Sequence, residues 1–282
     1  MPELPEVEIT ARRLDAALRG AEIESAVSPS LNTLKTFKPP LESLAGREVA
    51  GVRRIGKHLI VDATGELALL IHLMSAGRLQ LFERRAGRRD RTSRLLVRLA
   101  DGRELRLREF GTRQAAWVKL LDTADVARDE SVVRLGPEAW PDPPEDLRSL
   151  LSEPRPLHTQ LRDQQVIAGI GRSWVDEILW TARLSPFKRG ADLDADQAVA
   201  LRQAIISTLH QALVHYEKAV SLPIPDKMPM PLLVHRRQGE PCPRCGERLE
   251  AVHYEDYVMT YCPACQTGGR PLKDRRLSRL LK

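Results

Sequence analysis

The sequence predicts an α+β multidomain protein, and three observations carry this prediction. Residues 46–121 contain apolar runs that repeat with a period of two, which is typical of strands packed into a β-sandwich. Helical spacing of apolar residues replaces this pattern beyond residue 150. Four cysteines gather near the C-terminus as two CxxC pairs. With 282 residues, the chain is long enough for two domains and a small third module.

The first predicted element is a helix that leads into the strands. Val7, Leu14 and Leu18 fall at helical spacing, and Gly20 is placed to end the helix. Pro5 and the acidic residues after it are typical of a helix start, because proline fits the first turn and acids favour its positive end.

The segment ahead of this helix allows two interpretations. Removal of Met1 would leave Pro2 with a free secondary amine, and an α-amino group with a pKa of about 8 is partly unprotonated at neutral pH. Such an amine can attack a carbon electrophile, with Glu3 beside it to donate or accept a proton. The alternative is an ordinary helix start. Both interpretations can hold together, since the helix would fix the amine on a rigid element.

Strands follow the helix. Residues 57–61 and 67–73 are apolar runs separated by turn residues, and the clearest hairpin spans residues 94–108. Apolar residues alternate along both arms of this hairpin, and Asp101 with Gly102 supplies its turn.

The second half of the chain is expected to be helical. The proline-rich segment 136–144 predicts a linker, and helices are expected over 173–184 and 195–220. The proline-rich segment 222–230 excludes regular structure and favours a mobile loop. The predicted boundaries are a β-sandwich domain at 1–130, a linker at 131–150, a helical domain at 151–234, and a hairpin module with a basic tail at 235–282.

Composition restricts the classes of partner. The formal charge of +6 and the pI of about 9.3 favour a polyanion, although a solvated surface is the alternative. No apolar stretch approaches the roughly 20 residues of a membrane span, and the acidic N-terminus does not resemble a signal peptide. We therefore expect a cytoplasmic protein without a membrane partner.

The cysteines predict a structural zinc site. Cys242, Cys245, Cys262 and Cys265 form two CxxC pairs at a spacing that suits one tetrahedral Zn²⁺ ion, against the alternative of free or redox cysteines. Metal binding would supply much of the folding free energy of so small a module. Basic residues surround the site and predict a hairpin that faces DNA: Arg236, Arg237, Arg244, Arg248, Arg270, Lys273, Arg275, Arg276, Arg279 and Lys282.

Taken together, these residues resemble the formamidopyrimidine-DNA glycosylase and endonuclease VIII family over nearly the whole chain. The motifs that carry the resemblance are M-P-E-L-P-E-V-E at 1–8, R-R-I-G-K-H-L at 53–59, I-H-L-M-S-A-G-R-L at 71–79, R-E-F-G at 108–111, L-G-P-E at 135–138, D-Q-Q-V-I-A-G-I-G at 163–171 and the four-cysteine ribbon.

The resemblance implies a fold and an activity. The fold would be an N-terminal β-sandwich, a helix–two-turn–helix domain and a C-terminal zinc-finger β-hairpin, with DNA bound in the cleft. The activity would be that of a bacterial, monomeric, bifunctional DNA glycosylase and abasic-site lyase of base excision repair. Its substrate would be double-stranded DNA with a damaged, oxidised base or an abasic site.

The resemblance also implies roles for individual residues. Pro2 would be the nucleophile that attacks C1′, with Glu3 as proton donor and Glu6 as an assisting acid. Lys57 would contact a phosphate and assist catalysis, and His72 would contact another phosphate.

Further residues would bind the distorted duplex. Because the damaged nucleotide must leave the stack, Arg108 and Phe110 would fill the space that it vacates. Gly169 and Gly171 would offer backbone N–H groups to a phosphate.

Four departures from the family pattern limit this transfer. Ser75 stands where the family has a wedge methionine, which is displaced here to Met74; Arg172 replaces an asparagine; and Tyr257 replaces the finger arginine. The proline-rich segment 222–230 replaces the lesion-capping loop. We predict that Arg172 supplies the phosphate-binding guanidinium lost at Tyr257, and the preferred lesion is left open.

Two other functions compete with this one. A protein that binds damaged or structured DNA without efficient cleavage fits Tyr257 but leaves Pro2, Glu3 and Lys57 unexplained. A zinc-ribbon protein unrelated to repair does not explain the N-terminal motif.

Overall fold

The computed structural model describes residues 2–30, 32–87, 90–110 and 114–272. Predictions that concern Met1, Gly111 and the basic residues of 273–282 fall outside the described residues. Residue contacts divide the chain into two compact units. Unit 1 comprises Met1–Arg134 and Leu213–Pro229, and unit 2 comprises Leu135–Ala212 and Met230–Lys282. The domain boundaries drawn from the sequence stay a prediction.

Unit 1 begins with helix α1 (Leu4–Leu18). Glu3 is its N-terminal cap and forms a capping box with Glu6, which satisfies backbone groups that a helix start leaves open. Val7, Leu14 and Leu18 are fully buried, as their helical spacing predicts, and Gly20 follows the helix with φ of 79°.

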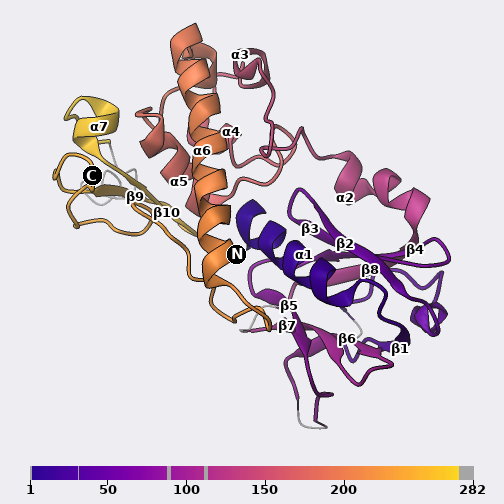
Figure 1. Cartoon of the computed structure of the whole chain (residues 1–282). Helices are drawn as coiled ribbons and strands as arrows, with labels where there is room; N and C mark the ends of the chain where they lie inside the picture. The colour runs from indigo at the N-terminus through magenta and orange to yellow at the C-terminus, as the bar shows by residue number, and fades with distance from the viewer. Residues whose placement is uncertain (1, 31, 88–89, 111–113, 273–282) are drawn as a thin grey trace. The chain divides into compact units, whose positions relative to one another are not determined.

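Two four-stranded antiparallel sheets form the β-sandwich of unit 1 (Figure 1). Their strand orders are β1-β6-β7-β5 and β2-β3-β4-β8. The bounds are β1 Ile23–Val27, β2 Val49–Ile55, β3 His58–Ala63, β4 Leu67–His72, β5 Gly77–Phe82, β6 Ser93–Leu99, β7 Glu104–Glu109 and β8 Trp117–Asp122. The predicted hairpin is β6–β7, with Gly102 at φ of 92° in its turn.

The core explains the two kinds of apolar pattern in these strands. Alternate residues of both sheets, such as Leu59 and Leu107, meet with Leu14 of α1 in one buried cluster. The opposite face of β3 and β4 is also covered, because Ile60 and Leu70 pack with Val126 of the 3₁₀ helix η2 (Thr123–Arg128). Strands buried on both faces therefore read as continuous apolar runs. Helices η1 (Leu41–Leu44) and α2 (Glu130–Val133) complete this part of the unit.

The proline-rich segment 222–230 contains no helix or strand, as predicted, and it is hydrogen-bonded to β5. The Gln80 amide donates to the Ile224 carbonyl and to Asp226 Oδ1 (2.9 Å), and Arg78 Nε donates to the Asp226 carbonyl at 2.9 Å. Ile224 is 1% exposed. Proline lacks an N–H donor, but carbonyls in a proline-rich segment still accept hydrogen bonds, and here β5 supplies the donors.

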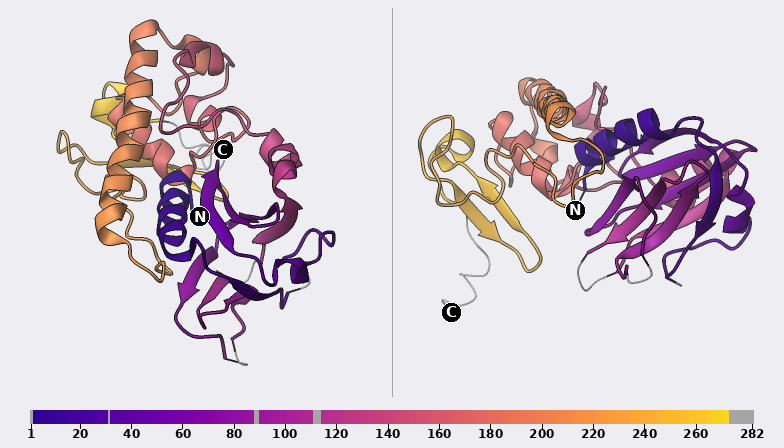
Figure 2. Two further views of the ribbon diagram at one scale, coloured as in Figure 1. Left: turned by 45° about the vertical axis from the view of Figure 1, so that its right-hand side comes forward. Right: turned by 60° about the horizontal axis from the view of Figure 1, so that its bottom comes forward.

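Unit 2 contains short helices around one long helix (Figures 1 and 2). They are α3 Leu147–Leu150, α4 Leu157–Gln160, α5 Arg172–Thr181, the 3₁₀ helix η3 Gly190–Asp192 and α6 Ala195–Ala219, whose last residues belong to unit 1. The hairpin of β9 (Glu250–His253) and β10 (Val258–Tyr261) leads into α7 (Pro263–Thr267).

Two buried acids of α5 connect the helices of unit 2 to this hairpin module. Asp176 bonds His158 Nε2 (3.2 Å), His235 Nδ1 (2.7 Å) and the Thr260 backbone N–H (3.0 Å). Glu177 accepts the backbone N–H groups of residues 233–235 at 2.8–3.0 Å.

Among the described residues, no helix has the length and apolar character needed to cross a membrane.

Candidate functional site

The N-terminal segment is buried in unit 1 just ahead of α1. Pro2 is buried, Glu3 is 1% exposed and Glu6 is 2% exposed. The Glu3 backbone N–H donates to Glu6 Oε2 at 2.8 Å. This N–H belongs to the peptide bond that joins Pro2 to Glu3, so the Glu6 carboxylate holds the peptide plane next to the Pro2 ring.

A tyrosine from α6 completes the hydrogen bonding of this carboxylate. The Tyr216 hydroxyl donates to Glu6 Oε1 at 2.5 Å, and the Tyr216 side chain is fully buried. Burial, and then the negative charge of Glu6, raises the pKa of Tyr216. Tyr216 therefore stays a phenol and donates its proton to the carboxylate.

Arg78 of β5 and Asp226 of the proline-rich segment interact with each other, and the charge of Glu6 also acts on Arg78. Burial lowers the pKa of Arg78, and the charges of Asp226 and Glu6 oppose this effect. The charge of Glu6 thus acts on Arg78, which is also tied to the Asp226 carbonyl. Arg78 and Glu6 both belong to unit 1, and burial strengthens the electrostatic attraction between such opposite charges.

Lys57 and His72 lie at one end of the β2–β3–β4 sheet. Lys57 follows Gly56 in the β2–β3 turn and is 7% exposed. The next residue, His58, is paired with His72 across the strands, with ring centroids 4.8 Å apart. The structure thus brings two of the predicted site residues to one sheet end.

The His72 ring is neutral and its tautomer is fixed. Burial lowers its pKa to about 3, with smaller contributions from His58 and Lys57. Its Nδ1 atom accepts the Met74 backbone N–H at 3.0 Å, which leaves the ring proton on Nε2. His72 can therefore donate one hydrogen bond to an anionic oxygen without carrying a charge.

The predicted void fillers lie on and after β7. The Arg108 guanidinium is 4.7 Å from the Phe110 ring centroid, so the two side chains form a cation–π pair. Arg108 also donates to Thr92 (3.0 Å) and Gln80 (3.1 Å) and contacts Asp226 (3.4 Å). Its guanidinium is folded onto the sheet in this structure.

The turn between β4 and β5 holds the displaced wedge residue. Met74 has a φ of 49°, and Ser75 is exposed beside it. Glycine is required at Gly77, because a Cβ there would lie 2.4 Å from the Leu73 carbonyl oxygen.

In unit 2, the glycine segment leads directly into α5. Gly171 is the N-terminal cap of α5, no side chain caps the helix, and Arg172 is its first residue. The Gly169 backbone N–H donates to Gln164 Oε1 at 2.9 Å. This bond occupies the Gly169 N–H that was expected to face a phosphate. The start of α5 still carries the positive end of a ten-residue helix dipole, which favours an anion.

Arg172 and Tyr257 are close together, as the paired departure from the family pattern suggests. The Arg172 guanidinium lies 5.2 Å from the Tyr257 ring centroid, donates to the Asp256 carbonyl at 2.7 Å and pairs with the Asp256 carboxylate. Arg162 lies closer to the ring, at 4.1 Å, and Tyr254 stacks on it at 4.3 Å.

The four cysteines form a cluster with the size of a metal site. Their Sγ atoms all lie within 4.8 Å of one another. A tetrahedral zinc site with Zn–S bonds of about 2.3 Å has edges of about 3.8 Å. The Cys245 Sγ is 3.5 Å from Cys262 Sγ and 3.4 Å from Cys265 Sγ, far longer than a disulfide of about 2.05 Å. The thiols therefore fit one metal ion.

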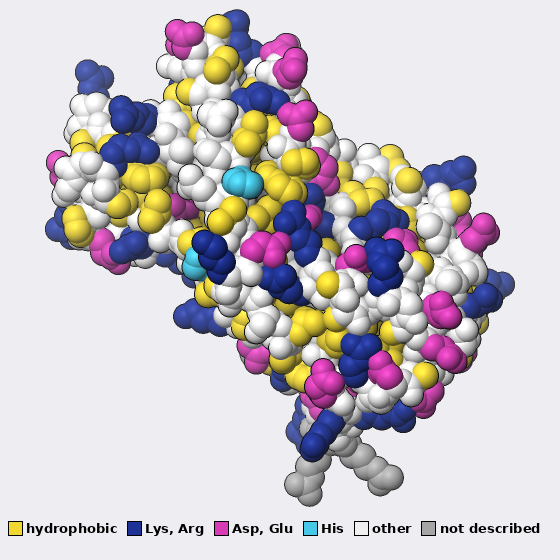
Figure 3. Space-filling model, in the orientation of Figure 1, with side chains coloured by type: hydrophobic (Ala, Val, Ile, Leu, Met, Phe, Trp, Pro, Cys, Tyr) yellow, Lys and Arg dark blue, Asp and Glu magenta, His cyan; other side chains and the backbone are white. Residues whose placement is uncertain are grey.

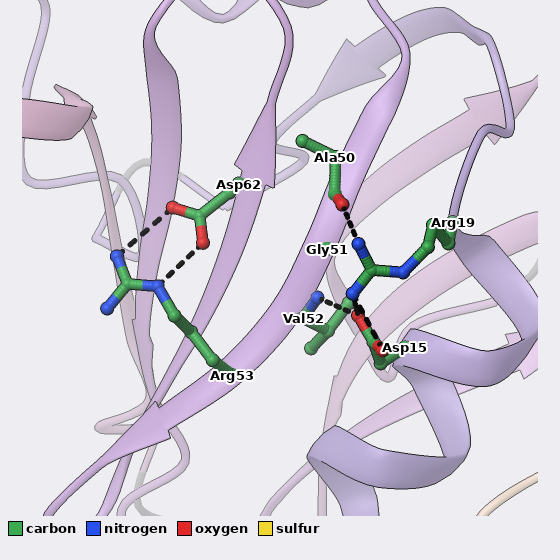
Figure 4. Close-up of a pocket in the computed structure, with 7 residues that line it drawn as sticks. All are labelled: Asp15, Arg19, Ala50, Gly51, Val52, Arg53 and Asp62. Atoms are coloured by element: carbon green, nitrogen blue, oxygen red, sulfur yellow. Dashed lines mark hydrogen bonds and ion pairs between the residues drawn. The ribbon is translucent and has the colours of Figure 1, made fainter.

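A surface hollow of unit 1 carries no site of its own (Figure 4). Asp15, Arg19, Arg53 and Asp62 line it, and all four are paired: Arg19 with Asp15 at 2.8 Å and Arg53 with Asp62 at 2.6 Å. On the face of unit 1 that Figure 3 shows, lysines and arginines are mixed with acids over the described residues.

Sequence reasoning missed Tyr216, Arg78, Asp226 and Arg162. Tyr216 lies in the helix expected over 195–220, at helical spacing from the apolar residues Leu209 and Leu213, which is typical of a packing residue. One signal was present, since a buried tyrosine hydroxyl needs a hydrogen-bond partner. The partner itself lies 210 residues away in the chain, so local spacing cannot identify it.

Two family models match the chain. Residues 1–114 match the formamidopyrimidine-DNA glycosylase N-terminal domain, and residues 136–222 match the formamidopyrimidine-DNA glycosylase H2TH domain. The second match covers the helix–two-turn–helix segment.

Curated relatives extend this similarity over nearly the whole chain. The formamidopyrimidine-DNA glycosylase of Lactococcus lactis is 30% identical over 278 residues, which cover 94% of this chain and 99% of that protein. The enzyme of Moorella thermoacetica is 34% identical over 266 residues, or 89% and 94%. An uncharacterised formamidopyrimidine-DNA glycosylase-like protein of Mycobacterium tuberculosis is 41% identical over 149 residues, or 52% and 94%.

Solved structures agree with the sequence matches. The Lactococcus lactis formamidopyrimidine-DNA glycosylase in complex with abasic-site DNA has a TM-score of 0.84 and 26% identity, and covers 94% of this chain and 99% of that one. The same enzyme with DNA containing N7-benzyl-Fapy-dG has a TM-score of 0.84 and 28% identity, with coverage of 94% and 100%.

Proposed function

Because this chain belongs to the formamidopyrimidine-DNA glycosylase family, we propose that it is a DNA glycosylase that removes damaged bases from double-stranded DNA and then cleaves the strand as an abasic-site lyase. The observation that carries this proposal is the buried Pro2–Glu3–Glu6 segment, in which a carboxylate fixes the peptide bond of Pro2. The Lactococcus lactis relative of this chain has been solved in complex with abasic-site DNA and with Fapy-dG DNA.

The proposed chemistry starts at the Pro2 nitrogen, once Met1 has been removed. The amine attacks C1′ of the damaged nucleotide, the N-glycosidic bond breaks and the base leaves with a proton. Glu3 protonates the ring oxygen as the sugar opens to an iminium. Loss of a C2′ proton breaks the C3′–O bond, and a second elimination breaks the C5′–O bond. Water then hydrolyses the iminium and returns the amine.

The remaining predicted residues would hold the DNA. Lys57 as a cation and neutral His72 as an Nε2–H donor suit two phosphates. Gly171 and Arg172 at the start of α5 suit another phosphate. Arg108 with Phe110 suits the space of the flipped nucleotide. The four cysteines would hold one Zn²⁺ ion, which would stabilise the hairpin module without entering the reaction.

The experiment that tests this function is a panel of duplexes, each with one defined lesion or one abasic site. We expect cleavage of the abasic duplex, with ends that show loss of both the 3′ and the 5′ bond, and base release from at least one oxidised lesion. Tyr257 stands where the family pattern has the finger arginine, and this departure favours a second candidate, a protein that binds damaged DNA without cutting it. Tight binding to the whole panel without any strand cleavage would select that candidate.

A further inference from the structure

The Tyr216 hydroxyl lies at the end of a hydrogen-bonded chain that leads to the peptide bond between Pro2 and Glu3. Tyr216 donates to Glu6 Oε1 at 2.5 Å, and Glu6 Oε2 accepts the N–H of the Pro2–Glu3 peptide bond at 2.8 Å. A peptide unit is planar, so fixing this N–H fixes the position of the Pro2 Cα atom. Rotation about the Pro2 Cα–C bond is then the one backbone torsion that still moves the amine relative to the fixed peptide plane.

Helix α6 presents Tyr216 from a fixed position on α1. Arg13 donates to the carbonyls of Glu217 (2.6 Å) and Val220 (3.0 Å), which are carbonyl groups at the C-terminal end of α6. Arg12 pairs with the Glu217 carboxylate at 3.0 Å. These contacts join the end of α6 to the middle of α1, one to two turns beyond Glu6.

We propose that Tyr216 is a positioning residue, which locks the Glu6 carboxylate in one orientation and thereby aims the Pro2 amine at its target carbon. This inference rests on the proposed function. Tyr216 does not touch the reacting atoms in this account. Without its hydroxyl, Glu6 can rotate and release the Pro2–Glu3 peptide, so that fewer bound complexes hold the amine in a reactive geometry.

The test is Tyr216→Phe, which removes the hydroxyl and keeps the ring. Borohydride trapping on abasic duplex under single-turnover conditions measures the rate of Schiff-base formation at saturating DNA. We expect this rate to fall about tenfold or more, as for the loss of a hydrogen bond to a charged group. Affinity for a duplex with a tetrahydrofuran abasic analogue, which cannot form the adduct, should change less than about twofold.

Two further variants make the result specific. Tyr261→Phe removes another buried tyrosine hydroxyl, one that accepts the Leu272 N–H at 2.7 Å, and should keep the wild-type trapping rate. In a cycle with Glu6→Gln, the double variant should trap no more slowly than Glu6→Gln alone, because Tyr216 acts through Glu6.

The outcomes separate this inference from the function on which it rests. If the wild-type protein forms no adduct, the proposed function fails and the role of Tyr216 fails with it. If the wild-type protein forms the adduct and Tyr216→Phe matches its rate, only the role of Tyr216 is overturned. The role of Tyr216 is also overturned if the double variant shows the product of the two single rate losses, since Tyr216 would then act independently of Glu6.

Discussion

Single side chains in this protein take roles that depend on their protonation. His72 is neutral because burial lowers its pKa, and a backbone N–H fixes its tautomer. Tyr216 stays protonated because burial raises its pKa. In both cases the fold makes a hydrogen-bond donor whose state does not change near neutral pH.

Buried His58 and partly buried His72 should make the stability of unit 1 depend on pH. Burial lowers the pKa of His58 to about 4 and that of His72 to about 3, while an unfolded histidine has a pKa of about 6.5. The unfolded chain thus binds more protons between about pH 4 and 6.5, so stability should fall as the pH falls through this range. Thermal unfolding of the wild type and of His58→Gln at several pH values measures this loss of stability. The variant should show the weaker pH dependence, because it lacks one of the two histidines. Equal dependence would contradict the role of His58.

Arg172 should contribute a phosphate contact even though it pairs with Asp256. DNA can exchange that exposed carboxylate for a phosphate at little cost, since surface ion pairs are weak. We expect Arg172→Ala to lose about tenfold in affinity for abasic-analogue DNA, and the slope of log affinity against log salt to weaken by about one. Arg189→Ala is the matched control, because Arg189 is also exposed and pairs with an aspartate. Identical salt slopes for both variants would exclude the contact.

Among the secondary-structure elements, α5 organises unit 2. Its first turn is the proposed phosphate site, and Asp176 and Glu177 in its middle bind the chain that enters the hairpin module. One helix therefore connects the two proposed DNA-binding parts of this unit.

Glu177→Gln should loosen this connection. The carboxylate accepts three backbone N–H groups, and an amide would turn an NH₂ donor toward at least one of them. We expect a loss of about 1–3 kcal/mol in unfolding free energy. Glu145→Gln, at an exposed position, is the control. Denaturant unfolding measures both variants, and a Glu177→Gln midpoint equal to that of the control would refute the assignment.

The elements themselves could largely be predicted from the sequence, because their signals are local. Period-two alternation predicted β6–β7, and helical spacing predicted α1 and α6. The contacts of segment 222–230 could not be predicted this way, since they depend on donors from Gln80 and Arg78, which lie more than a hundred residues earlier.

The same limit applies to the site. The N-terminal motif and the cysteine spacing predicted Pro2, Glu3 and the candidate metal ligands, because each of these signals lies within one short stretch of the chain. The contacts of Tyr216 with Glu6 and of Arg162 with Tyr257 join distant segments. No spacing rule predicts such pairs, and they emerge only when the helices and strands have packed.

Over the whole molecule, the two units should respond differently to loss of metal. Unit 1 has a large apolar core from both sheets and α1, while the hairpin module packs few buried apolar residues around its cysteines. Chelation should therefore unfold the hairpin module, release one zinc ion per chain and weaken DNA binding. Amide hydrogen exchange should show lost protection in β9 and β10 and retained protection in β3 and β4. Unchanged exchange in β9 and β10 after metal release would contradict a structural metal.

The central claim is that the Pro2 amine forms the covalent bond to the sugar. Borohydride trapping on abasic duplex, followed by proteolysis and mass spectrometry of the adduct peptide, tests it most directly. We expect the adduct on a peptide that begins at Pro2, with Met1 absent. An adduct on a lysine, or full activity in protein that retains Met1, would contradict the claim.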